Sequence, residues 1–193
     1  GSATVVRSGC MAKDADMILS EFILLGIGGK ELSEENAAQT AKALNIIQPD
    51  FIRVHATGIK LESKLGEFVR DGSFTLQSEE EIVIEQKLFL QQLHEMDSYY
   101  VNEHIVNLLL EVRGNLRTEK QEMLSTIDRF LTLPPDERFL FTVGRRLNIF
   151  FRLDDLKKPK LHQKAGESLQ QILSKNPHVD FAALCNYVRQ SQI

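Results

Sequence analysis

The feature that most constrains the fold is a nearly continuous apolar segment, residues 17–25, that stops at a glycine-rich stretch, 26–29. Its length and composition are typical of a strand buried in a parallel sheet. A helix is predicted over 33–47, with Ser33 as its N-cap and acidic residues in its first turn. Residues 51–55 are predicted to form a second short strand. Strand, glycine turn, helix and strand make a βαβ unit, which implies parallel strands joined by a right-handed crossover.

Two strands are too few to form a stable sheet by themselves. We therefore expect the rest of the sheet to come from residues that precede this chain or from another molecule. The dipeptide Gly1-Ser2 is typical of the residue left when a purification tag is removed, so that the native sequence begins at about Ala3. That position lies inside a helix predicted over 3–16, as expected of a fragment of a longer protein.

From Ser78 onward the patterns are almost all helical. Ser78 followed by three glutamates is a capping box that opens a long amphipathic helix. A brief extended segment is predicted at 99–101, and helices over 102–112, 118–131, 136–148, 163–175 and 180–190. The predicted organisation is an α/β unit over residues 1–75 and a helical extension over 76–193.

Composition excludes several classes of protein. The net charge of -4 and the 26% content of charged residues indicate an ordinary soluble chain without a domain-wide phosphate-binding surface, so that nucleic acid is not expected as a partner. No apolar run is long enough to span a bilayer, and membrane association is not expected. The cysteines Cys10 and Cys185 are far apart and are predicted to be free thiols in the cytoplasm.

The glycine-rich stretch Gly26-Ile27-Gly28-Gly29 is the first candidate ligand site. Ligands of parallel α/β folds bind at the carboxyl ends of strands, where glycine allows positive φ and close approach to the backbone. The alternative is a tight turn that binds nothing. The spacing does not match the dinucleotide fingerprint GxGxxG.

Arg53 and His55 alternate with apolar residues on the second predicted strand, so both should point to the same face of the sheet. In a barrel they would face a cavity and contact a ligand; otherwise they lie at a solvent-exposed strand end. Glu103, His104 and Asn107 permit a metal or acid–base cluster, but a capping or hydrogen-bonding role is favoured because ligand-like spacing is absent. No catalytic residue and no metal ligand is predicted.

The order of several stretches resembles radical S-adenosylmethionine (SAM) enzymes. Residues 22–35, 44–45 and 49–53 resemble the fifth strand, the following helix and the sixth strand of the partial (β/α)6 TIM-like barrel of that superfamily. Further stretches resemble a subgroup of iron–sulfur oxidoreductases related to coproporphyrinogen oxidase: 102–109, 127–131, 133–138 and 144–147. The resemblance covers about 11–156 and implies that the chain is the C-terminal part of such a barrel followed by a helical extension.

By this resemblance, Gly26, Ile27, Gly28 and Gly29 would lie along the adenine of SAM. The full-length protein would be an enzyme that binds SAM at a [4Fe–4S] cluster, whereas this chain alone is expected to be inactive and to carry neither group. The substrate, a small molecule or one of another kind, is not specified.

The sequence departs from the family pattern at three places. The proline of the usual Gly-Leu-Pro-Gly-Glu turn is Gly28 here, with the acid one place late at Glu31. The Pro-Gly-Thr-Pro-Leu segment expected after the sixth strand is replaced by 61–65, and CxxxCxxC is absent. Two other hypotheses remain: a helical module that binds protein or RNA, and a SAM- or nucleotide-binding protein of different chemistry. The fragment hypothesis also predicts exposed sheet edges through which copies of the chain could self-associate.

Overall fold

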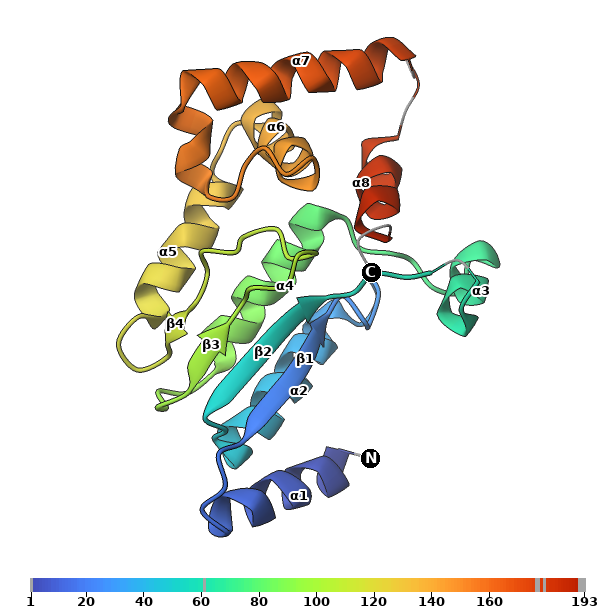
Figure 1. Ribbon diagram of the computed structural model, residues 1–193. Coiled ribbons are helices and arrows are strands. Elements are labelled where there is room, and N and C mark those ends of the chain that lie inside the picture. Colours follow the sequence, from blue (N-terminus) through green and yellow to red (C-terminus); the bar gives the residue numbers. More distant parts are fainter. Residues whose placement is uncertain (1, 61, 176–177, 179, 191–193) are drawn as a thin grey trace.

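The computed structural model describes residues 2–60, 62–175, 178 and 180–190. Within these residues the chain forms an α/β fold of eight helices, a short 3-10 helix and four strands (Figure 1). In chain order the elements are α1 (Ser2–Asp14), β1 (Ser20–Leu25), α2 (Ser33–Ile47), β2 (Phe51–Ala56), α3 (Lys64–Arg70), α4 (Glu79–Gln92), β3 (Tyr99–Val101), β4 (Gly114–Asn115), α5 (Lys120–Leu131), α6 (Pro135–Arg146), η1 (Leu153–Lys157), α7 (Pro159–Lys175) and α8 (Phe181–Gln190).

The four strands form one open sheet in the order β1-β2-β3-β4. The first three strands are parallel and β4 is antiparallel to β3. The expected α/β class and the parallel pairing of β1 with β2 are confirmed. The expectation of about two strands was too low, because β3 and β4 extend the sheet from within the segment predicted to be a helical extension. The sheet of the described residues is open and does not close into a barrel.

In the part of the chain that the structure describes, helices cover one face of this sheet and not the other. Alternate residues of β1 and β2 are buried, among them Ile23, Ile52 and Val54, and they belong to the same core as residues of α2 and α4. Both helices lie behind the sheet in Figure 1. The side chains between these core positions remain accessible: Phe22 is 64% exposed and Leu24 is 47% exposed. We call the side that carries them the uncovered face.

The helices that follow β4 build a second part of the core beyond the sheet. Phe130 of α5 packs edge-on against Phe141 of α6, which stacks on Phe150 in the segment after α6. Phe150 approaches Gly144 so closely that an added Cβ there would lie 2.3 Å from the ring. Glycine is therefore required at that position of α6 for the aromatic cluster to pack.

Most predicted helices are confirmed, with the capping box of α4 formed by Ser78 and Glu81 as expected. The segment predicted to be extended at 99–101 is β3, whereas α3 was not predicted. Ser33 lies at the start of α2 but does not cap it, because its hydroxyl donates a hydrogen bond to Glu85 instead. Asn176 and Pro177, predicted to separate the last two helices, lie outside the described residues.

The helix predicted over 102–112 is wrong, because asparagine side chains bind the backbone in its place. Asn102 donates from Nδ2 to the carbonyl of Leu109. Asn107 donates to the carbonyl of Val54 and accepts from the amide of Ala56, which joins this loop to β2. Such side-chain bonds compete with a helical ladder.

Within the described residues, no helix has the length and apolar content needed to cross a membrane.

Candidate ligand site at the carboxyl ends of the strands

A hollow of about 400 Å³ lies where β1 and β2 end, at the place where ligands of parallel sheets bind. The loop after β2 and the loop after β3 form most of its wall. It is lined by Leu24, Ile27, His55, Ala56, Thr57, Gly58, Ile59, Lys60, Ser63, Leu65, His104 and Val106. Its volume falls within the range of small-molecule sites, and its lining combines apolar side chains with a few polar groups.

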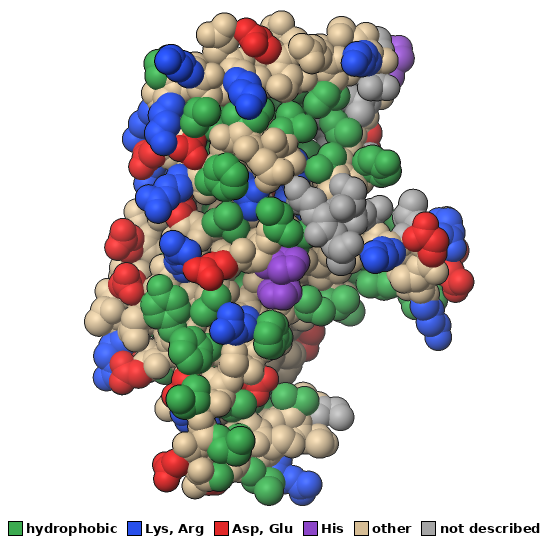
Figure 2. Space-filling view, viewed as in Figure 1, with side chains coloured by type: hydrophobic (Ala, Val, Ile, Leu, Met, Phe, Trp, Pro, Cys, Tyr) green, Lys and Arg blue, Asp and Glu red, His purple; other side chains and the backbone are tan. Residues whose placement is uncertain are grey.

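Two histidine rings stack at this hollow. The rings of His55 and His104 have centroids 4.1 Å apart and an interplanar angle of 17°. The ring of Phe22 packs edge-on against His55 at 5.5 Å. Figure 2 shows histidine side chains together on this side of the molecule, with hydrophobic ones nearby.

The environment favours an uncharged imidazole at His55. Burial lowers the pKa of His55, and electrostatic interaction with His104 and Arg53 lowers it further. Nδ1 of His104 is buried and has no hydrogen-bond partner in the described part of the chain. A neutral imidazole can both donate and accept a hydrogen bond, so the ring of His55 could orient a polar ligand that enters the hollow.

The glycine turn 26–29 is hydrogen-bonded to Glu85, a residue that the sequence analysis did not single out. The fully buried carboxylate of Glu85 accepts hydrogen bonds from the amide of Gly26, the hydroxyl of Ser33 and the amide group of Asn36. The turn is therefore fastened to α4 and to the start of α2. Three converging donors also provide the solvation that a buried carboxylate requires.

Of the turn residues, only Ile27 lines the hollow. Gly26 and Gly29 have φ of 82° and 64°, a backbone conformation that favours glycine. A Cβ at Gly28 would lie 2.9 Å from the carbonyl oxygen of Leu32. The tight turn thus accounts for the three glycines without a ligand, and Ile27 is the turn residue placed to contact one.

Arg53 and His55 lie on the uncovered face, as their alternation predicted, but only His55 reaches the hollow. Nε of Arg53 donates to the hydroxyl of Ser20 at 3.0 Å. Its guanidinium lies over the rings of Phe22 and Phe51, at 5.9 and 6.0 Å from their centroids. Arg53 therefore packs on the uncovered face and does not line the hollow. Its charge affects the hollow by lowering the pKa of His55.

The possible metal cluster at Glu103, His104 and Asn107 is not assembled. Glu103 pairs with Arg113, and Asn107 binds β2. In the described ranges, no three histidine, cysteine, aspartate or glutamate side chains lie close enough together to hold a metal ion. Burial raises the pKa of Cys185 to about 12, which makes its thiol a poor nucleophile.

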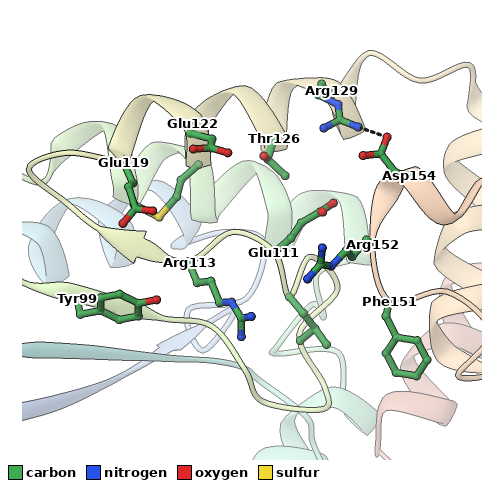
Figure 3. Close-up of a pocket in the computed structure, with 12 residues that line it drawn as sticks. Tyr99, Glu111, Arg113, Glu119, Glu122, Thr126, Arg129, Phe151, Arg152 and Asp154 are labelled. Carbon is green, nitrogen blue, oxygen red and sulfur yellow. Dashed lines mark hydrogen bonds and ion pairs between the residues drawn. The ribbon is translucent and has the colours of Figure 1, made fainter.

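A second hollow of about 520 Å³, which we call the charged pocket, is lined by β3, α5 and the loop after α6 (Figure 3). Arg113 forms an ion pair with Glu103, which is not one of the lining residues. Arg129 forms an ion pair with Asp154, which is. Its lining residues are Tyr99, Leu110, Glu111, Arg113, Glu119, Glu122, Met123, Thr126, Arg129, Phe151, Arg152 and Asp154.

Comparisons of the chain with protein-family models, with curated proteins and with solved structures found no match.

Proposed function

We propose that this chain is the C-terminal part of a radical SAM enzyme and supplies one wall of its SAM and substrate cavity. The observation that carries the proposal is the direction in which the sheet is wound. Strands β1, β2 and β3 are added in sequence order, and α2 and α4 both pack on the same face. Repeated crossovers in one direction are the way a (β/α) barrel is built, whereas doubly wound folds place helices on both faces.

The uncovered face supports the same proposal. In a partial (β/α)6 barrel, the face without helices lines the interior and is covered by the remaining strands. Here that face carries exposed apolar side chains, including Phe22 and Leu24, which are costly to leave in water. The outer edge of β1 is also without a partner strand among the described residues. Both features are expected if further strands of the sheet lie outside this chain.

The hollow at the carboxyl ends of the strands suits the adenosyl part of SAM in size and lining. Ile27 and Leu24 offer apolar contacts for adenine, and His55 with Thr57 offers polar ones. When bound to the cluster in the complete enzyme, SAM would supply a 5'-deoxyadenosyl radical. In this proposal the residues of the present chain orient the nucleoside and exclude water.

The cluster itself does not fit this chain. Three cysteine ligands are needed, and the chain contains only Cys10 and Cys185, at opposite ends of the sequence. Cys185 is buried in the helical part, and Cys10 lies on α1. The proposal therefore requires the cluster-binding cysteines to lie in another segment of the protein, and no catalytic step is assigned to this chain.

The test begins with the coding sequence upstream of residue 1. The proposal expects CxxxCxxC after a predicted strand, with further strand–helix units before α1. The longer protein, with its cluster reconstituted, should bind and cleave SAM. Ile27→Glu should weaken SAM binding, while Ile84→Glu, at an exposed apolar position of α4, should not.

A start codon just before Ala3 would refute the proposal and favour a protein- or RNA-binding module. SAM binding without CxxxCxxC would instead favour a SAM-binding protein of different chemistry.

A further inference from the structure

Three arginines are buried together where α6 and α8 meet the start of α4. Arg145, Arg146 and Arg189 are 0%, 3% and 2% exposed. The buried carboxylate of Glu79 receives two hydrogen bonds from Arg146 and lies 3.5 Å from a nitrogen of Arg189.

Arg145 is the member of the cluster that the described residues leave least satisfied. Its Nη2 donates to the carbonyl of Ile105 at 2.9 Å. Its Nε and Nη1 are buried and lack a hydrogen-bond partner among the residues that the structure describes. Burial and the charge of Arg146 lower the pKa of Arg145 to about 10, so it remains a cation at neutral pH. A buried cation with unused donors is costly unless an anion compensates it.

Arg145 contacts one residue next to the lining of the candidate ligand site and one residue of the charged pocket. Ile105, which its guanidinium binds, lies in the chain between His104 and Val106, both of which line the candidate ligand site. The guanidinium also lies 5.7 Å from the ring centroid of Phe151. Phe151 is 49% exposed and lines the charged pocket, as Figure 3 shows.

We propose that Arg145 binds an anionic group of a ligand, a carboxylate or a phosphate, that reaches it from the charged pocket when the ring of Phe151 moves aside. Nε and Nη1 then donate to the anion while Nη2 keeps its bond to Ile105. Arginine suits this role because its planar guanidinium binds carboxylate and phosphate oxygens well. The inference goes beyond the proposed function and does not depend on it, because it requires neither SAM nor a cluster.

The experiment follows the Nε–H resonances of the arginines by NMR while inorganic phosphate or acetate is added to the full chain at constant ionic strength. The Arg145 resonance is assigned by its loss in Arg145→Lys. We expect this resonance to shift and saturate with one of the two anions, which identifies the group. Arg129, on the wall of the same pocket but paired with Asp154, is the control and should show no saturable shift.

Calorimetry supplies the quantitative arm. Arg145→Met should weaken binding of that anion by about tenfold to a hundredfold, which is the loss of affinity expected when hydrogen bonds to a charged group are removed. Arg129→Met should leave the affinity unchanged. Phe151→Ala should bind at least as tightly as wild type, since only a covering ring is removed. Absence of saturation with both anions, or equal effects of the two arginine variants, would overturn the inference. Anion binding without SAM binding by the longer protein would leave it standing while the proposed function fails.

Discussion

At the scale of single residues, the turn that carries Ile27 depends on a carboxylate on a distant helix. Glu85 lies 59 positions from Gly26 in the sequence and accepts its amide hydrogen bond at 3.0 Å. It also accepts hydrogen bonds from the hydroxyl of Ser33 and the side-chain amide of Asn36. This one side chain joins β1, α2 and α4, so its removal should affect both stability and the shape of the hollow.

We expect Glu85→Ala to lower the free energy of unfolding by about 3 kcal/mol, because buried donors lose their acceptor. Glu85→Gln, which keeps one acceptor oxygen, should cost less. Urea denaturation monitored by circular dichroism measures both. Glu122→Ala is the matched control, since Glu122 is an exposed glutamate, and it should change stability by less than about 0.5 kcal/mol. Equal losses for Glu85→Ala and Glu122→Ala would mean that the network contributes nothing.

His55 makes a prediction about pH. Its pKa is lowered in the folded state by burial, by His104 and by Arg53. The unfolded chain therefore takes up a proton first as the pH falls below about 6.5, and stability is lost between that value and the folded pKa. NMR titration should give His55 a pKa below the ordinary value, and His104→Ala should raise it. A His55 pKa at or above about 6.5 in the wild-type protein would contradict the stacked, half-buried arrangement.

At the scale of elements, two helical glycines with opposite surroundings test the packing of the second core. Gly144 of α6 faces the ring of Phe150, whereas a Cβ at Gly166 of α7 would meet nothing within 4 Å. The aromatic cluster thus depends on the absence of a side chain at Gly144, while the glycine in α7 only adds conformational freedom to the unfolded chain.

We expect Gly144→Ala to destabilise the protein by about 2–3 kcal/mol through overpacking. Gly166→Ala should stabilise it by about 0.5–1 kcal/mol, as alanine does inside helices. Thermal and urea unfolding of the two variants, measured side by side, give the signs. If the two substitutions change the free energy of unfolding in the same direction and by the same amount, the packing described for α6 is wrong.

At the scale of the whole molecule, the sheet has one covered and one uncovered face, and the outer edge of β1 has no partner strand among the described residues. A half-covered sheet with exposed aromatic and aliphatic side chains tends to bind other surfaces or to self-associate. The direction of winding and the uncovered face together support the proposal that this chain is part of a larger α/β protein.

We therefore expect concentration-dependent self-association of the isolated chain, detected by sedimentation velocity. Phe22→Lys, on the edge strand and the uncovered face, should reduce that association with little loss of stability, because Phe22 is 64% exposed. Phe68→Lys, on α3, is the control and should leave association unchanged. A chain that stays monomeric at all concentrations would show that the uncovered face is tolerated in water.

The local elements could be predicted from the sequence because their determinants are close together in the chain. The glycine stop after 17–25, the acidic first turn of 33–47 and the Ser78–Glu81 box each act over a few residues. The glycine turn and His55 were likewise predicted as site residues and lie at the carboxyl ends of their strands, with Ile27 and His55 in the hollow itself. Their role as ligand contacts stays a prediction.

Only the tertiary structure decided what holds and completes the site. Asn107 binds the backbone of β2 from 53 positions away, which replaced a predicted helix with a loop and brought His104 onto His55. The third parallel strand, the Glu85 clamp and the buried position of Arg145 are also products of long-range packing. Their physical cause is the burial of polar groups, since a carboxylate, an amide or a guanidinium inside the protein must find partners wherever the fold places them. The sequence by itself determined the βαβ unit and its glycine turn, and the satisfaction of buried polar groups determined the shape of the site.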